Sequence, residues 1–230
     1  MTNSSTPEKS PLRFYTAPLS MFGMKVEIAL REKGLAFERI AVPFTLADGY
    51  SPKHAEVLRI NPKGQVPVLI HGDLELFDST QIFEYLEDLA PEPPLWPRAI
   101  AGRARARLLE HKSDEIYFPP IVRLMGLQAA PDDPAAIEAR AAAASFYDER
   151  EKGLGSGEWL AGSYSYADIA FYMAQLFGER MGAAMTDAHP RLEAWRSRMS
   201  ARPAVCAGSR ARWGAISCRR GASCRPFWRS

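Results

Sequence analysis

The sequence NPKGQVPVLIHGDLELFDSTQIFEYLED, residues 61–88, decides the fold. It begins with turn residues, and two short apolar runs (66–70 and 74–77) then flank Gly72-Asp73, which is the pattern of a β-hairpin. From residue 79 onward the apolar positions follow helical spacing, at Ile82, Tyr85, Leu86 and Leu89. The stretch therefore predicts a turn, a hairpin and a helix in succession.

The residues before this stretch predict a βαβ unit. Leu12 to Thr16 has the composition of a strand, a helix begins at Ser20 and stops at Gly34, and 36–41 predicts a second strand. A short helix is expected over 53–60. The order β-α-β-α-β-β-α, within about 80 residues, predicts an α/β sandwich with a mixed sheet.

The residues after it predict only helices. A proline-rich linker occupies 90–97, and helices are expected over 103–118, from 134 to about 152, over 165–181 and from Pro190 onward. Pro119-Pro120 is expected to end or kink the first of them, because proline disrupts a helix interior. These patterns divide the chain into four expected segments: a disordered N-terminus (1–10), the α/β domain (11–90), an all-α domain (98–203) and an atypical basic tail (204–230).

The tail differs in composition from the rest of the chain. Residues 204–230 hold arginines but no lysine or acid, and all three cysteines of the chain. Without the tail the acidic residues outnumber the basic ones, so a nucleic-acid-binding surface is not expected. The composition favours a frameshift, and a genuine basic tail that docks on anionic partners is the alternative.

Composition also excludes some classes of protein. With 47% hydrophobic and 24% charged residues the chain resembles an ordinary globular protein. No apolar run approaches the ~20 residues that span a bilayer, and the first ten residues lack the apolar core of a signal peptide. The cysteine spacings match no zinc site. We expect a cytoplasmic protein with no metal and no membrane partner.

Ser20 lies where a strand passes into a helix, at the expected N-cap. It is either a plain cap or a thiolate-stabilising group, since its hydroxyl, the first free N–H groups and the helix dipole favour an anion there. Lowering a thiol pKa of ~8.5 by ~2 units requires ~2.7 kcal/mol, which a charge-assisted hydrogen bond and a helix terminus can supply.

Two further positions have both a structural and a functional interpretation. Pro67 interrupts a β run, so it lies at an edge, a bulge or a cis bend. If it is cis, the backbone of Val66 faces outward and can pair with an extended peptide. Asp78 and Gln81 have the spacing of a capping box, and Ser79 at the same helix start can bind a carboxylate while Asp78 faces an ammonium group.

Three segments together resemble the cytosolic glutathione S-transferases of the serine type, as found in bacteria. They are FYTAPLSMFGMKVEIAL (14–30), the stretch 61–88, and EWLAGSYSYADIAF (158–171), and the resemblance extends over roughly 12–203. It implies a thioredoxin-like N-terminal domain, an all-helical C-terminal domain and a homodimer. The capping sequence at 165–168 is structural in this family.

The resemblance also implies a glutathione site. Ser20 stabilises the thiolate, with Tyr15 as its rival because some classes use a tyrosine from the end of the first strand. Val66 pairs with the cysteinyl backbone, and Asp78 and Ser79 hold the γ-glutamyl end. Two further glutathione-binding residues are Gln65 and Lys53, of which Lys53 meets the glycyl carboxylate or is simply solvated.

The implied activity is conjugation of glutathione to small hydrophobic electrophiles. No cysteine precedes residue 206, which disfavours thiol–disulfide exchange at position 20. Glutathione-dependent dehalogenation, ether cleavage or isomerisation would use the same site, and a non-enzymatic binding or regulatory protein is the other alternative. The helical domain is expected to supply an apolar pocket for the electrophile. Tyr117, Phe118, Leu124 and Met125 are candidates for its wall, although for each of them a place in the ordinary helical core is the favoured interpretation.

Overall fold

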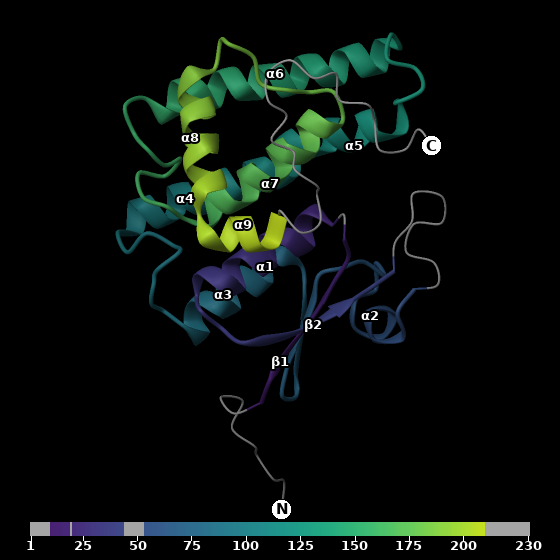
Figure 1. Cartoon of the computed structure of the whole chain (residues 1–230), viewed down its shortest axis with the longest axis vertical. Helices are drawn as coiled ribbons and strands as arrows, with labels where there is room; N and C mark the ends of the chain where they lie inside the picture. Colours follow the sequence, from purple (N-terminus) through teal and green to yellow (C-terminus); the bar gives the residue numbers. More distant parts are fainter. Residues whose placement is uncertain (1–9, 19, 44–52, 210–230) are drawn as a thin grey trace, which may run out of the picture.

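A four-stranded mixed sheet forms the N-terminal part of the molecule (Figure 1). The computed structural model describes residues 10–18, 20–43 and 53–209. The strands β1 (Leu12–Thr16), β2 (Phe37–Ala41), β3 (Val68–His71) and β4 (Leu74–Phe77) lie in the order β2-β1-β3-β4. β1 and β2 are parallel, and β3 is antiparallel to both β1 and β4. The predicted α/β fold with a mixed sheet is confirmed.

Three helices cover the two faces of this sheet. They are α1 (Met21–Glu32), α2 (Ala55–Ile60) and α3 (Ser79–Leu89). Side chains of a strand alternate between faces, so Phe14 packs into the main core with α1 and α3, while Tyr15 packs with Val57 of α2 on the other face. The sheet therefore has α1 and α3 on the side of the helical domain and α2 on the opposite side.

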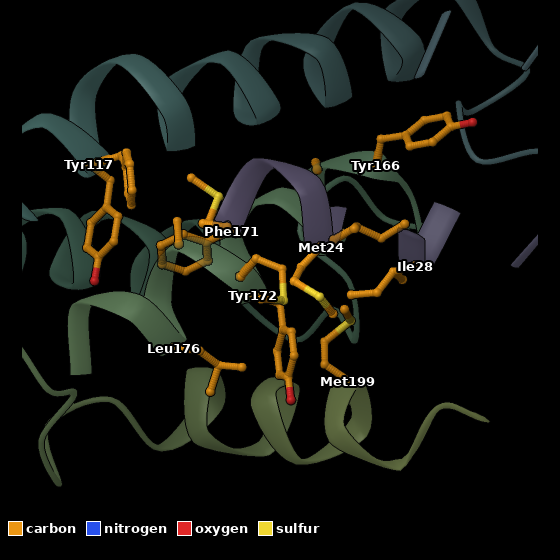
Figure 2. Packing of buried hydrophobic residues seen from close by; sticks show 14 of the residues in the cluster. Met24, Ile28, Tyr117, Tyr166, Phe171, Tyr172, Leu176 and Met199 are labelled. Carbon is orange, nitrogen blue, oxygen red and sulfur yellow. The ribbon is translucent and has the colours of Figure 1, made fainter. Parts of the chain in front are cut away.

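Helices alone form the C-terminal part, as predicted. They are α4 (Ile100–Lys112), the π-helical turn η2 (Ser113–Tyr117), α5 (Phe118–Gly126), α6 (Pro134–Leu154), α7 (Tyr166–Arg180), α8 (Pro190–Ala201) and α9 (Pro203–Ser209). α7 is buried over nearly its whole length, and the predicted capping box between Ser165 and Asp168 is present. Figure 2 shows Met24 and Ile28 of α1 among the buried side chains of α7, so one continuous core joins the two parts.

The first helix of this part ends earlier than predicted. Its α-helical hydrogen bonding stops at Lys112, η2 follows, and α5 then begins at Phe118. Pro119 and Pro120 therefore lie in the first turn of α5, where an N–H group has no partner within the helix and its absence costs little. The helix is interrupted as predicted, and the interruption is the five-residue turn η2, which ends at Tyr117, two residues before Pro119.

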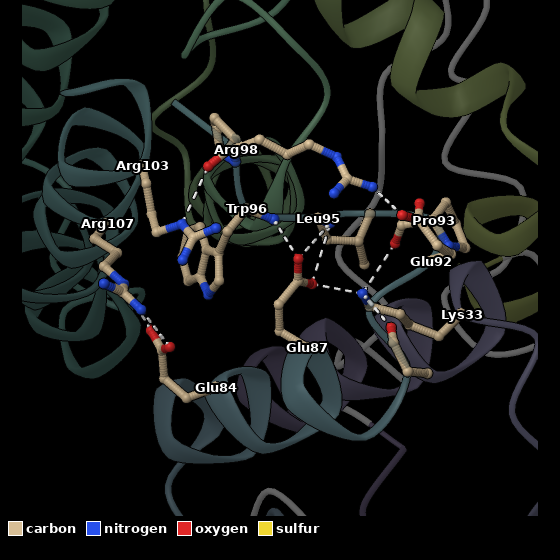
Figure 3. A network of polar contacts seen from close by, with 12 residues as sticks. Lys33, Glu84, Glu87, Glu92, Pro93, Leu95, Trp96, Arg98, Arg103 and Arg107 are labelled. Carbon is tan, nitrogen blue, oxygen red and sulfur yellow. Dashed lines mark hydrogen bonds and ion pairs between the residues drawn. The ribbon is translucent and has the colours of Figure 1, made fainter. Parts of the chain in front are cut away.

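The proline-rich linker is tied to the α/β part (Figure 3). The ammonium group of Lys33 donates to Glu87 and to the carbonyl oxygens of Ala90 and Pro93, at 2.8 and 2.9 Å. The Glu87 carboxylate in turn accepts the N–H of Leu95 at 3.1 Å. We call Lys33 and Glu87 the linker clamp, because they hold the connection between the two parts in one position.

Helix α9 continues the packed helical part beyond residue 203. Ala204 and Val205 are buried in the main core. The predicted disordered N-terminus, except for Ser10, and the predicted basic tail from residue 210 onward lie outside the described residues. Among the helices described, none has an apolar stretch long enough to cross a membrane.

Candidate functional site

A cavity of about 500 Å³ lies between the α/β part and helix α4. One wall consists of the loop 61–67 and the start of α3, and the other consists of α4 and η2. The cavity brings together four of the predicted site residues, namely Gln65, Val66, Asp78 and Ser79. A cavity at the junction of two domains is a common place for a small-molecule site.

The start of α3 presents a helix N-terminus to this cavity. The Asp78 carboxylate accepts the N–H groups of Thr80 and Gln81, at 3.0 and 3.3 Å. The amide and hydroxyl of Ser79 have no hydrogen-bond partner among the described residues, although its side chain is buried. These groups and the helix dipole are suited to an anionic group such as a carboxylate.

The backbone of Asp78 has an unusual conformation. Its φ of 75° lies in the left-handed region, which residues other than glycine rarely adopt. Such conformations often occur at ligand-binding sites, where the surrounding structure holds them in place.

The loop before β3 places free backbone groups at the cavity. The Val66–Pro67 peptide bond is cis, which is one of the three predicted possibilities. In the described part of the chain, neither the N–H nor the C=O of Val66 takes part in a hydrogen bond. The side-chain amide of Asn61 donates to the carbonyl oxygen of Gln65 at 2.7 Å and so fixes the shape of this loop. Val66 can therefore pair with an extended peptide.

Ser20 is the N-cap of α1, as predicted. Its hydroxyl oxygen accepts the N–H of Gly23 at 3.0 Å, so the hydroxyl proton remains available for donation. A side chain at Gly23 would clash with Thr16, because its Cβ would lie 2.2 Å from the Thr16 hydroxyl. Ser20 itself does not line the cavity, but Phe22, two residues later, does.

Tyr15 has a different environment. It is 3% exposed and packs on the α2 side of the sheet, with its ring centroid 5.0 Å from that of His54. Tyr15 does not line the cavity. Helix α1, which Ser20 caps, lies on the other face of the sheet.

Lys53 is exposed and lies outside the cavity lining. Its ammonium group lies beside Gly64, where an added Cβ would be 2.8 Å away. Lys63, which was not among the predicted site residues, does line the cavity. The sequence contained a signal for it, because Lys63 belongs to the same turn as Gln65.

The wall formed by α4 and η2 was also not predicted. Charged and polar residues line it at helical spacing, and they are Arg107, Glu110, His111, Asp114 and Glu115. Arg107 pairs with Glu84 of α3 (Figure 3). In the sequence this pattern resembles the solvated face of any helix, and only the packing of α4 against α3 turns that face into a cavity wall.

A buried lysine lies behind this wall. The ammonium group of Lys25, which is fully buried, is 3.0 Å from Glu110 and 2.6 Å from Asp114. Thr80 donates its hydroxyl to the same Glu110 oxygen at 2.9 Å. Burial acts to lower the pKa of Lys25, but the charges of Asp114 and Glu110 raise it by more.

The second carboxyl of this group has a shifted pKa as well. Burial raises the pKa of Asp114 to about 6, although Lys25 opposes that shift. Its Oδ2 faces Lys25, and its Oδ1 is buried without a hydrogen-bond partner in the described residues. Glu110 and Asp114 are therefore two carboxylates that share one buried cation, Lys25.

Both halves of the chain match known family models. The model of the glutathione S-transferase N-terminal domain matches residues 14–94, and that of the C-terminal domain matches residues 114–203. The chain belongs to the glutathione S-transferase family. The resemblance noted from the sequence is confirmed.

Individual relatives agree with this assignment. The chain is 42% identical over 100 residues to glutathione S-transferase 1 of Dianthus caryophyllus, covering 44% of each chain. It is 32% identical to glutathione S-transferase 3 of Zea mays, over 85% of this chain and 91% of the relative. It is also 32% identical to a stringent starvation protein A homolog of Coxiella burnetii, over 48% of this chain and 50% of the relative. The first and third matches thus span about half of those relatives.

Solved structures give the same result. A glutathione S-transferase from Rhodospirillum rubrum has a TM-score of 0.73 at 28% identity, over 86% of this chain and 91% of that one. A glutathione transferase family member from Pseudomonas fluorescens, with two glutathione bound, has a TM-score of 0.73 at 25% identity. Its match covers 90% of this chain and 94% of that one.

For three of its four residues, the candidate apolar wall of this glutathione S-transferase follows the favoured interpretation, in which they belong to the helical core. None of the four candidates lines the cavity. Tyr117, Phe118 and Leu124 are buried in the main core, and Met125 is 45% exposed. Tyr117 points inward because Gly178 leaves room for its hydroxyl, which lies 2.0 Å from where a Cβ would be.

Proposed function

We propose that this chain is a cytoplasmic glutathione transferase that joins the sulfur of glutathione to a small electrophile. The observation that carries the proposal is the cavity that collects Gln65, Val66, Asp78 and Ser79 around the start of α3. These are the residues that the sequence indicates for glutathione, and they come from separate segments. Membership of the family and the glutathione-bound relative from Pseudomonas fluorescens support it.

Each part of the tripeptide has a matching group in this proposal. The free N–H and C=O of Val66 pair with the cysteinyl residue in an extended conformation. The amide and hydroxyl of Ser79 bind the γ-glutamyl carboxylate, and the exposed Asp78 binds its ammonium group. Gln65 contacts the glycyl end from the loop, and Lys53 supplies a positive charge nearby.

Ser20 is the proposed thiolate-stabilising residue. Its oxygen is occupied by the Gly23 N–H, which directs the hydroxyl proton outward to an acceptor. Tyr15 remains its rival, but its ring is enclosed on the α2 side of the sheet, which supports Ser20. In the reaction, the thiol proton passes to solvent and the thiolate attacks an electrophilic carbon. A C–S bond forms, and the leaving group departs with the electron pair of its bond.

Two assays test this function. Retention on immobilised glutathione, followed by turnover of 1-chloro-2,4-dinitrobenzene, is expected of a transferase. Retention without turnover of any electrophile would favour the non-enzymatic alternative, which the similarity to a stringent starvation protein A homolog makes the second candidate. Dehalogenation, ether cleavage and isomerisation share this site and are distinguished by their products.

We further propose a homodimer with no metal. In the described residues, no group of three or more histidine, cysteine, aspartate or glutamate side chains is arranged to hold a metal ion. Light scattering is expected to give twice the mass of one chain, and a stable monomer at micromolar concentration would contradict the dimer.

A further inference from the structure

The two walls of the cavity carry a surplus of negative charge. Five carboxylates line it, and they are Asp78, Glu84, Glu110, Asp114 and Glu115, against the cations Lys63 and Arg107. Arg107 is already paired with Glu84 at 2.6 Å. Cavity walls of one sign focus the field and attract a ligand of the opposite sign. Glutathione, with two carboxylates and one ammonium group, does not supply that opposite sign.

The surplus is concentrated on one wall. Lys25 lies behind that wall and is the one described cation bonded to both Glu110 and Asp114, so one negative charge is left over. The side chain of Asp114 is only 10% exposed, and its Oδ1 has no donor in the described residues. Since buried polar atoms are nearly always paired, this oxygen can accept a hydrogen bond from a bound water or from an N–H group of a ligand. Glu115, the next residue, is exposed at the same wall.

The wall is linked through Lys25 to the start of α1, where Ser20 is the N-cap. Lys25, which contacts Asp114, also lies 5.3 Å from the ring centroid of Phe22. Phe22 lines the cavity two residues after Ser20, the proposed thiolate-stabilising residue. Glu110, by contrast, is bonded to Thr80 at the start of α3, where the γ-glutamyl end is proposed to bind. Asp114 and Glu115 follow Glu110 by about one helical turn, and in the described residues no hydrogen bond joins either of them to Thr80.

We propose that Asp114 and Glu115 bind a positively charged group, such as an ammonium group, on the electrophile. This inference rests on the proposed function and narrows its substrate class from small hydrophobic electrophiles to cationic ones with a small apolar part. Phe22 supplies the apolar contact, and its ring can also face a cation. The matching charge brings the electrophile close to the thiolate.

A pair of electrophiles that differ only in charge tests the proposal. The cationic probe is 4-(trimethylammoniomethyl)benzyl bromide, and the neutral probe is 4-neopentylbenzyl bromide, which has the same shape. In both reactions a C–S bond forms at the benzylic carbon, the C–Br bond breaks, bromide takes the electron pair, and the thiol proton goes to solvent. For each probe, kcat/KM is divided by the rate constant of its uncatalysed reaction with glutathione. The quantity compared is the ratio of this value for the cationic probe to that for the neutral probe.

The expected result is a preference for the cationic probe of about tenfold or more, which corresponds to one charge interaction of about 1.4 kcal/mol. Asp114→Asn and Glu115→Gln should each reduce this ratio, and the double variant should bring it near one. Glu138→Gln is the matched control, because it removes an exposed acid on α6, away from the cavity, and should leave the ratio unchanged. Should Asp114→Asn not fold, Glu115→Gln alone still tests the wall, since that side chain is exposed.

The proposal would be overturned by a wild-type ratio of one or below. It would also be overturned by a ratio that the variants do not change. If that unchanged ratio came with a raised KM for glutathione in Asp114→Asn, Asp114 would hold the glutamyl ammonium group instead.

Failure of the proposed function is detected separately. If neither probe is turned over, binding of benzyltrimethylammonium is measured by calorimetry in the wild type and in Glu115→Gln. Binding that weakens in the variant supports the cation site without any transferase activity, and no binding by the wild type refutes it.

Discussion

Removing the hydroxyl of Ser20 should raise the pKa of bound glutathione. The hydroxyl oxygen is held by the Gly23 N–H at 3.0 Å and the residue is 7% exposed, so its proton is oriented and partly shielded from water. A hydrogen bond to a charged group in such a place contributes about 1.5–3 kcal/mol, or about 1–2 units of pKa. The Gly23 N–H, freed in Ser20→Ala, can itself donate to the thiolate, which favours the lower end of that range.

The assay follows the ultraviolet absorbance of the bound thiolate against pH, together with kcat. In Ser20→Ala, kcat should fall about tenfold at pH 6.5 and much less at pH 9, where the thiol ionises without help. The KM for glutathione should change little, because Val66, Asp78 and Ser79 carry its binding.

The variant Tyr15→Phe is the control, since it removes only the rival hydroxyl. A pH-dependent loss in Tyr15→Phe but not in Ser20→Ala would refute the assignment and leave Ser20 as a helix cap. The thermal stability of Ser20→Ala must be measured as well, because loss of an N-cap destabilises a protein by about 1 kcal/mol.

Three other expected outcomes follow from the structure. Ser79→Ala should weaken glutathione binding by about 1–2 kcal/mol in calorimetry while Asp78 still caps α3, and an unchanged affinity would make Ser79 only part of a cap. Because burial raises the pKa of Asp114 to about 6, its carboxyl is charged above that pH and neutral below it; the preference for the cationic probe should therefore decline as the pH falls through 6, and a flat profile would contradict this. Gly178→Ala should lower the stability by about 1–3 kcal/mol in thermal unfolding, since its Cβ would overlap the Tyr117 hydroxyl, and an unchanged melting temperature would mean that the core adjusts freely.

The sequence predicted the elements well where local chemistry determines them. The hairpin at Gly72 and the end of α1 near Gly34 both depend on glycines with positive φ, at 64° each. The predicted strand from Val66 instead begins at Val68, because Pro67 has no N–H to donate and Val66 lies outside the ladder. The cap residues Asp78 and Ser165 were found because capping is a local interaction.

The cavity could be predicted only in part, for a physical reason. Its first wall comes from a turn and a helix cap, so Val66, Asp78 and Ser79 were identified from local patterns, and Gln65 was added through the family resemblance. Its second wall depends on which face of α4 packs toward α3, and that is set by contacts between residues more than twenty positions apart, such as Thr80 with Glu110. The polar face of α4 was therefore not identified as a cavity wall, whereas the buried position of Tyr117 agrees with the favoured core interpretation.

The linker clamp also constrains how proteins of this family can be recombined. Lys33 ends α1 and Glu87 lies in α3, yet both are bonded to the segment that leads into the helical domain. A chimera that joins this N-terminal half to another helical half keeps the Lys33–Glu87 pair, but a crossover before residue 90 would take the main-chain partners at 90, 93, 95 and 96 from the other protein. The junction for exchanging halves should therefore lie after Trp96. The whole connection that Lys33 and Glu87 hold then stays with the N-terminal half, and the new helical half is attached to a linker whose position is already set.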